Sequence, residues 1–261
     1  KQVKYILCDI TNKISLKKYI RINFKYVVNL GGYVDHSKKK RTFESHYVGC
    51  KNLTEILMNR IPDSFIQIGS SIEYGNIKSP QKESSKSNPK SIKSVYGKAK
   101  LLSSMYLIEL FKKKRFPCTI LRLYLAYGPR QDINRFLPII IDGCIKNKKF
   151  DCSSGNQLRD FVYIEDVVRA IIKSLTNKNA IGQIINIGSG KPIKIRKIIK
   201  YIKKISKGGY PQFGKIKLRK DEILKLYPNI KKARNIIHWK PKVSFEKGLK
   251  LTIKFYNEQA R

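Results

Sequence analysis

A tyrosine and a lysine four residues apart, Tyr96 and Lys100, have the types and spacing needed for proton transfer. In a helix, residues four apart lie on one face, one turn from each other. A phenol normally loses its proton near pH ~10, and a nearby ammonium lowers that pKa because it stabilises the phenolate. A tyrosine tuned in this way can exchange a proton with a hydroxyl or carbonyl group at neutral pH.

The spacing alone is not specific, because lysine is frequent in this chain. The same Tyr-x-x-x-Lys pattern occurs at 47/51, 74/78 and 227/231. Helix-disfavouring residues follow each of those tyrosines closely, namely Gly49, Gly75 and Pro228. Only after Tyr96 does an apolar pattern with helical period continue, over residues 99–110. We therefore expect the functional pair at Tyr96 and Lys100.

The composition is that of a globular protein with an extreme positive charge. The 261 residues can form one large domain or two small ones, and 41% of them are hydrophobic. No apolar run approaches the ~20 residues that cross a bilayer, so no membrane association is expected. The 56 basic and 18 acidic residues give a net charge of +38, which would attract polyanions such as nucleic acid. Because the lysines are spread along the whole chain, we favour compositional drift over nucleic-acid binding.

The five cysteines occur singly, and no Cys-x-x-Cys is present. This argues against a disulfide framework or a zinc site and suits a reducing compartment. We expect a cytoplasmic protein without a metal site.

Short apolar runs alternate with longer amphipathic ones along the chain. Strands are predicted at 3–8, 26–30, 65–68, 118–124 and 183–187, and an apolar stretch at 161–164 follows a polar turn. Helices are predicted at 14–22, 43–58, 96–110, 136–145, 166–175 and 193–205, with loops at 78–93 and 206–213. This alternation implies a parallel sheet with helices on both faces, in which ligands bind at the carboxyl ends of the strands. Asp9, Gly31, Gly32, Ser70 and the segment after Tyr124 would lie on that edge.

Several motifs occur in a fixed order along essentially the whole chain. They are ILCDI (6–10), VNLGG (28–32), GSSIEYG (69–75), RLYLAYGP (122–129), RDFVYIEDV (159–167), NIG (186–188) and WKP (239–241). Together with Tyr96 and Lys100, they resemble the extended short-chain dehydrogenase/reductase family, of the NAD-dependent sugar-nucleotide epimerase/dehydratase type. The motif around Arg159 is the most specific of these matches.

The resemblance implies an α/β fold, with a Rossmann-like doubly wound parallel sheet and a smaller C-terminal substrate-binding domain. The dinucleotide-binding domain would comprise 1–125 with 161–190 returning to it, and the nucleotide-sugar domain 126–160 and 191–261. The cofactor would be NAD, with NADP possible. The family also implies a homodimer, formed through the Tyr96 helix and the helix at 43–58.

The resemblance also implies roles for individual residues. Ser70 would hold a substrate oxygen, Tyr96 would move its proton, and Lys100 would tune the tyrosine and contact the cofactor ribose. The implied cofactor-binding residues are Asp9, Ile10, Leu30, Gly31, Gly32, Gly69, Tyr96 and Lys100. The implied substrate-binding residues are Ser71, Leu125, Asn134, Arg135, Phe136, Arg159, Asn186 and Arg219. The two arginines would bind the nucleotide diphosphate, which suits guanidinium geometry.

Three features depart from the family pattern. No G-x-x-G-x-x-G is present, and the matching order starts at the family's third strand, so we expect about two strand–helix units, roughly 40–60 residues, to be missing at the N-terminus. Leu125 replaces a usual substrate-binding asparagine. His46 replaces a common helical asparagine, and we interpret it as an ordinary packed or solvent-facing histidine.

The residues after Ser70 bear on which reaction is expected. Dehydratases of this family have an Asp-Glu pair directly after the serine or threonine, where this chain has Ser71 and Ile72. Glu73 comes one place late, and a shift of one at a strand end turns a side chain the other way. We therefore expect an epimerase that works through a transient 4-keto intermediate. The alternatives are an NAD(P)H-dependent 4-keto reductase, then a 4,6-dehydratase, or a non-catalytic nucleic-acid-binding scaffold.

Overall fold

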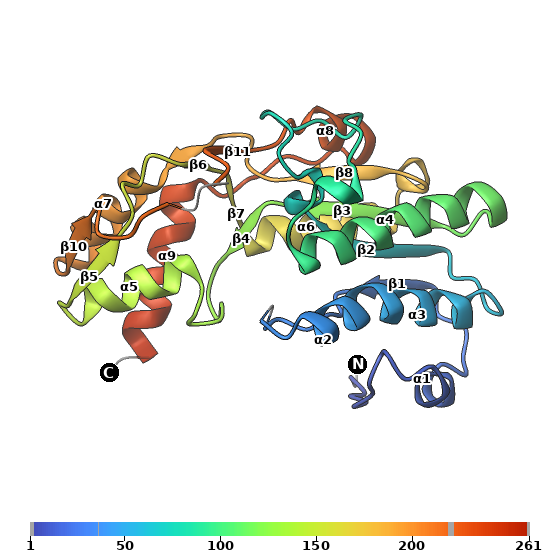
Figure 1. Cartoon of the computed structure of the whole chain (residues 1–261). Helices are drawn as coiled ribbons and strands as arrows, with labels where there is room; N and C mark the ends of the chain where they lie inside the picture. Colours follow the sequence, from blue (N-terminus) through green and yellow to red (C-terminus); the bar gives the residue numbers. More distant parts are fainter. Residues whose placement is uncertain (1–2, 36, 219–221, 260–261) are drawn as a thin grey trace. The chain divides into compact units, whose positions relative to one another are not determined.

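The structure is a computed structural model that describes residues 3–35, 37–218 and 222–259. The chain divides into two compact units (Figure 1). Unit 1 comprises Lys1–Ile77, Glu83–Arg122 and Ile171–Ile185, and unit 2 comprises Lys78–Lys82, Leu123–Ala170 and Asn186–Arg261. The assignment of cofactor and substrate to separate domains remains a prediction.

Unit 1 is built around a four-stranded parallel sheet. Its strands are β1 (Tyr26–Asn29), β2 (Ser64–Ser70), β3 (Cys118–Leu123) and β8 (Ile184–Ile187), in the order β1-β2-β3-β8. Each strand was predicted from a short apolar run. β2 and β3 are almost entirely buried, which explains why their apolar residues occur on both faces rather than only at alternate positions. The sheet confirms the α/β, Rossmann-like fold class.

Four α-helices accompany the sheet in unit 1. They are α1 (Lys13–Tyr19), α2 (Lys39–Phe43), α3 (Gly49–Leu57) and α4 (Val95–Lys114), and a π-helical turn at Glu44–Val48 joins α2 to α3. α4 begins where the Ser94 hydroxyl accepts a hydrogen bond from Gly97 N, and it ends at Arg115 in a left-handed conformation. Leu57, Phe65 and Leu107 are among the residues that form the core between helices and sheet.

The predicted first strand, at residues 3–8, is wrong. These residues have no strand structure, and Tyr5 and Leu7 are 91% and 100% exposed. A strand needs a neighbour that satisfies its backbone hydrogen bonds. Among the described residues no strand pairs with this segment, and β1 is the edge strand of the sheet. Asp9 accordingly lies in a turn before α1 rather than at a strand end.

Unit 2 combines short strands with four helices. The strands are β4 (Leu125–Tyr127), β5 (Lys149–Cys152), β6 (Leu158–Arg159), β7 (Phe161–Tyr163), β9 (Ile193–Lys194), β10 (Tyr210–Phe213) and β11 (Lys225–Leu226). The helices are α5 (Phe136–Ile145), α7 (Ile195–Ser206), α8 (Lys231–Ile237) and α9 (Phe245–Gln259), and α6 (Ile164–Leu175) crosses the boundary between the units. α5, α7 and α9 contact one another around a core that includes Leu137, Ile202 and Leu249 (Figure 1).

One predicted loop in unit 2, residues 206–213, contains a strand. α7 ends at Lys207, which has a left-handed conformation, and Gly209 has a positive φ of 89°. The chain then runs parallel to β5 as β10, in which Pro211 pairs with Phe150. A proline fits here because β10 is an edge strand of a two-stranded sheet, where one side needs no backbone donor.

No helix in the described parts of the chain combines the length and the apolar character that a membrane crossing requires.

Candidate functional site

Ser70 lies at the last residue of β2, where the strand turns into a short 3₁₀ helix (Ser71–Tyr74). Its hydroxyl accepts a hydrogen bond from Ile72 N at 3.4 Å, and its own N–H donates to Glu73 Oε1 at 2.7 Å. This is a reciprocal capping box, which holds the serine in an extended conformation at the carboxyl edge of the sheet. The Ser70 side chain is half-buried.

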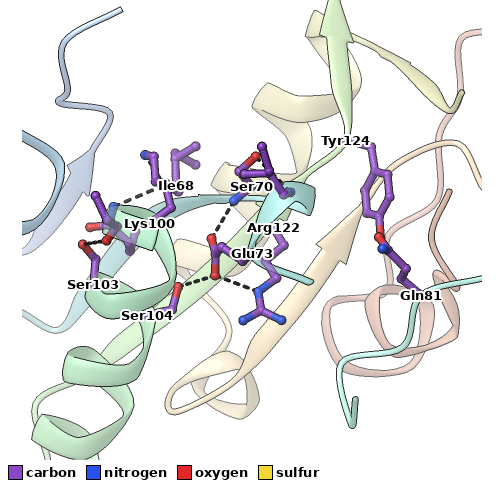
Figure 2. A network of polar contacts seen from close by, with 12 residues as sticks. Ile68, Ser70, Glu73, Gln81, Lys100, Ser103, Ser104, Arg122 and Tyr124 are labelled. Atoms are coloured by element: carbon purple, nitrogen blue, oxygen red, sulfur yellow. Dashed lines mark hydrogen bonds and ion pairs between the residues drawn. The ribbon is translucent and has the colours of Figure 1, made fainter. Parts of the chain in front are cut away.

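Tyr96 and Lys100 lie in the first turns of α4, on the same face as their spacing predicts. Lys100 Nζ is 5.9 Å from the centroid of the Tyr96 ring. The same ammonium donates a hydrogen bond to Ile68 O in β2 at 2.8 Å (Figure 2). α4 packs against both β2 and the 3₁₀ helix after Ser70. One side-chain bond therefore ties the Tyr-Lys pair to the strand that carries Ser70.

Lys100 is 4% exposed. Burial lowers its pKa, while the negative charge of Glu73 opposes that change. A buried lysine of this kind is a feature of functional sites as well as of structural networks.

His46 contacts Tyr96, a contact that the sequence did not indicate. The two rings meet edge to face with their centroids 5.0 Å apart, and His46 is 7% exposed. A Cβ at Gly32 would lie 1.8 Å from His46 Cε1, and Gly32 has a φ of 150°. Only glycine fits between this ring and the turn after β1. Of the two interpretations left open for His46, packed or solvent-facing, the structure shows the packed one, but no periodicity could have identified Tyr96 as its neighbour.

The turn after β1 is held by a buried pair of amides. Asn29 donates to Gln67 Oε1 at 2.8 Å, and Gly31 N donates to Asn29 Oδ1 at 3.0 Å. Leu30, between Asn29 and Gly31 in the chain, is 69% exposed. Neither amide was predicted as functional, although Asn29 is a polar residue at the end of β1 and Gln67 is a buried polar residue in the middle of β2. They fix the backbone at the position where the family resemblance implies cofactor binding.

Two other residues with an implied cofactor role lie away from strand ends. Asp9 accepts hydrogen bonds from the N–H and the hydroxyl of Thr11, each at 2.8 Å. These bonds, led by the backbone one, lower the pKa of the Asp9 carboxyl. The Ile10 side chain packs against Gly49 in α3. A Cβ added at Gly49 would lie only 2.7 Å from Ile10 Cγ2.

Glu73 is the centre of a buried network that the sequence did not predict. Its carboxylate, 0% exposed, accepts hydrogen bonds from Ser104 Oγ at 2.7 Å and Arg122 Nε at 2.8 Å, besides the one from Ser70 N (Figure 2). The guanidinium of Arg122 lies over the Tyr74 ring, 4.4 Å from its centroid. Glu73 thus connects β2, α4 and β3.

In unit 2, Arg159 and Asp160 lie side by side in the chain with different partners. Arg159 forms an ion pair with Glu222. Asp160 is 0% exposed and accepts bonds from Ser189 N at 2.6 Å and Ser189 Oγ at 2.9 Å. Burial raises the pKa of Asp160 to about 6, and the bonds from residues 189–191 oppose that change.

The remaining residues with an implied substrate role differ in exposure. Asn186 is fully buried, and its amide donates to Gln81 O at 3.0 Å and to Asn229 O at 3.4 Å. Gln81 also accepts a bond from the Tyr124 hydroxyl at 2.7 Å (Figure 2). The structure places Leu125, Asn134 and Arg135 on the surface, Phe136 half-buried and Ser71 buried, while Arg219 lies outside the described residues. Their binding roles remain predictions.

Residues 1–188 of the 261 match the family model described as the NAD dependent epimerase/dehydratase family. The chain belongs to this family. The match confirms the resemblance drawn from the ordered motifs.

Two relatives are named for different nucleotide-sugar enzymes. The chain is 32% identical over 162 residues to the CDP-abequose synthase of Salmonella muenchen, covering 59% of this chain and 55% of that one. It is 32% identical over 173 residues to a putative UDP-glucose 4-epimerase of Methanocaldococcus jannaschii, covering 64% of this chain and 55% of that one. The chain thus spans about half the length of these curated relatives.

Solved structures of the family share the fold. The UDP-glucose 4-epimerase of Thermotoga maritima, solved with UDP-glucose, superposes with a TM-score of 0.87 at 24% identity, covering 97% of this chain and 84% of that one. This similarity supports the Rossmann-like architecture of the family member described here.

Proposed function

We propose that this family member is an NAD-dependent epimerase that acts on a nucleotide sugar through a transient 4-keto intermediate. The observation that carries the proposal is the anchored pair in unit 1: Tyr96 and Lys100 share one face of α4, and Lys100 is bonded to the strand that ends in Ser70. The putative 4-epimerase among the relatives supports the same reaction type.

Each of the three side chains has a distinct task in this reaction. Tyr96 Oη accepts the proton of the sugar C4 hydroxyl during oxidation and returns a proton when the ketone is reduced on its other face. The Lys100 ammonium stabilises the phenolate form of Tyr96 by its positive charge. The Ser70 hydroxyl donates a hydrogen bond to the same sugar oxygen and keeps it within reach of Tyr96.

The described residues fit the nicotinamide end of a dinucleotide. An ammonium has three N–H donors, of which Ile68 O takes one from Lys100, so this side chain can also donate to ribose hydroxyls. The turn at Gly31 and Gly32, fixed by Asn29, would hold the cofactor by its backbone. A bound nicotinamide would supply the acceptor and donor of the hydride exchanged with the sugar carbon. The sequence contains no G-x-x-G-x-x-G for the pyrophosphate.

The surroundings of Glu73 favour epimerisation over dehydration. A dehydratase needs an acid for the leaving hydroxyl and a base for a carbon-bound proton. Glu73, the acid nearest to Ser70 in sequence, is 0% exposed and already accepts bonds from three donors. The positions directly after Ser70 hold a serine and an isoleucine, neither of which is an acid. A 4-keto reductase would need the same triad, and it remains the second candidate because the anchored pair serves both reactions.

The substrate contacts belong to the same proposal. Arg159, and Arg219 outside the described residues, would bind the nucleotide diphosphate through charge-assisted hydrogen bonds. The other residues implied by the family resemblance would contact the rest of the nucleotide sugar, and the protein would form a homodimer.

Replacing Tyr96 tests the function directly. UDP-, dTDP- and CDP-hexoses are incubated with the protein and NAD, and C4 epimers are resolved by chromatography. We expect Tyr96→Phe to lower turnover by about 10²–10⁴, the usual contribution of acid–base catalysis, and to leave nucleotide-sugar binding nearly unchanged.

Tyr47→Phe is the matched control. Tyr47 has the same spacing to Lys51, whose Nζ lies 5.8 Å from the ring centroid, but it belongs to the π-helical turn rather than to α4. Retained turnover in Tyr96→Phe would refute the role of Tyr96. Consumption of NADPH in proportion to product would identify a reductase instead, because an epimerase recycles its cofactor.

A further inference from the structure

The buried carboxylate of Glu73 is engaged on both oxygens, and one of them bonds the backbone of Ser70. Oε1 accepts from Ser70 N at 2.7 Å, while Oε2 accepts from Ser104 Oγ at 2.7 Å and from Arg122 Nε at 2.8 Å (Figure 2). Ser104 lies on α4 one turn after Lys100, and Arg122 lies on β3. A single carboxylate therefore joins the serine to the helix of the Tyr-Lys pair.

The neighbouring residues make room for this carboxylate. A Cβ at Gly69 would lie 2.6 Å from Glu73 Oε1, so the residue before Ser70 has to be small for the bond to form. Ser104 and Arg122 are 1% and 2% exposed, which removes competing water from the network. Hydrogen bonds to an ionised acceptor are about twice as strong as neutral ones. The backbone of Ser70 is thus held by a strong bond in a dry setting.

We propose that Glu73 is a positioning residue, whose carboxylate fixes the backbone of Ser70 relative to α4 and so sets where the Ser70 hydroxyl lies with respect to Tyr96. The inference rests on the proposed function for its effect on turnover. Glu73 stands one residue later than the acid pair of the dehydratases, and its role would be structural: it acts on Ser70 and does not touch substrate.

Amide hydrogen exchange measures the positioning without requiring activity. In Glu73→Gln one carboxylate oxygen is replaced by an NH₂ group, which is a donor and cannot accept a hydrogen bond. At least one of the bonds from Ser70 N, Ser104 and Arg122 is therefore lost. We expect exchange at Ser70 N to quicken by about tenfold, and exchange at Phe65 and Ile66 in the same strand to stay unchanged. Ser104→Ala removes one of the three bonds to the carboxylate and leaves those from Ser70 N and Arg122 in place, so it should quicken the exchange by only about two- to threefold.

Kinetics on the same variants test the effect on the reaction. A misplaced catalytic group lowers kcat steeply, so Glu73→Gln should lower kcat by about tenfold with KM within about twofold. Ile202→Ala is the matched control, because it opens a cavity in the core of unit 2 and lowers stability without contact to this network. It should change neither Ser70 exchange nor kcat. If Glu73→Gln does not fold, Ser104→Ala carries the test.

The outcomes separate this inference from the proposed function. Unchanged Ser70 exchange in folded Glu73→Gln, or in Ser104→Ala alone, overturns the inference even if Tyr96→Phe abolishes turnover. If exchange at Ser70 N is faster in Glu73→Gln than in the wild type, but the wild type epimerises no nucleotide sugar, the positioning is supported and the proposed function is contradicted. A kcat loss in Ile202→Ala as large as that in Glu73→Gln also overturns the inference, since stability alone would then explain it.

Discussion

The carboxyl group of Asp160 should make the stability of unit 2 depend on pH in the direction opposite to that of a surface carboxylate. Asp160 is 0% exposed, and burial raises its pKa from 3.8 to about 6. Between these two pH values the folded protein binds more protons at this site than the unfolded chain does. Its contribution to stability is therefore fully present below pH 3.8 and is lost as the pH rises through 6.

The magnitude follows from the two pKa values. A shift of about two units corresponds to about 3 kcal/mol in total, at 1.36 kcal/mol per unit. Between pH 4 and pH 7 we expect about 2 kcal/mol of that difference. This is a large fraction of the ~5–15 kcal/mol that stabilises a typical domain. Asp160→Asn retains the shape and an oxygen acceptor for Ser189 N but does not titrate, so it should lack this pH dependence.

Urea unfolding followed by tryptophan fluorescence measures the effect. The single tryptophan, Trp239, is buried in unit 2, where its Nε1 donates to Asp166 O at 2.9 Å, so it reports on the unit that contains Asp160. The unfolding free energy of Asp160→Asn is subtracted from that of the wild type at each pH from 4 to 7, which cancels the effect of the net charge. A difference that stays flat, or that rises with pH, would refute the reasoning.

Two further predictions concern an arginine that is held in an ion pair and cysteines that are buried. Because Glu222 holds Arg159 in an ion pair, Glu222→Gln should bind nucleoside diphosphates several-fold more tightly in titration calorimetry; unchanged or weaker binding would show that the guanidinium is not a diphosphate ligand. Because burial raises the thiol pKa of Cys50 and Cys118 to about 12, neither should react with iodoacetamide at pH 8 in the folded protein, whereas the half-buried Cys8 should; peptide mapping that finds all three labelled at one rate would contradict this burial.

The elements with strong local patterns were predictable from the sequence. The Tyr96 helix has a serine cap at Ser94 and a long apolar repeat, and both features are local to the segment. β2 and β3 are buried on both faces, so their short, mainly apolar runs identified them without knowledge of their neighbours. The spacing of Tyr96 and Lys100 likewise gave their shared face directly.

Elements that depend on distant partners were not predictable in the same way. Residues 3–8 have a strand-like apolar run, but a strand also needs a neighbouring strand, and the run itself contains no information about one. β10 was missed for the opposite reason: the glycines before it and its own proline indicated a loop, while its partner strand β5 lies 61 residues earlier in the chain (Tyr210 pairs with Lys149). Asn186 donates to the backbone at Gln81 and Asn229, partners distant in sequence that its own segment could not indicate, and its expected contact with substrate remains a prediction.

Glu73 shows how a departure from a motif can have a structural use. Its position, one residue later than the acid pair of a dehydratase, was an argument against dehydration because it turns the side chain away from the site. In the structure Glu73 lies in the 3₁₀ helix Ser71–Tyr74 rather than on a continuing strand, and its carboxylate accepts bonds from Ser70 N, Ser104 and Arg122. The engagement of the carboxylate with these three donors therefore withholds it from acid–base chemistry and at the same time fixes the Ser70 backbone. Since a buried Arg122 without Glu73 would be an uncompensated charge, the two residues should tolerate replacement together better than singly, as double-mutant unfolding would show.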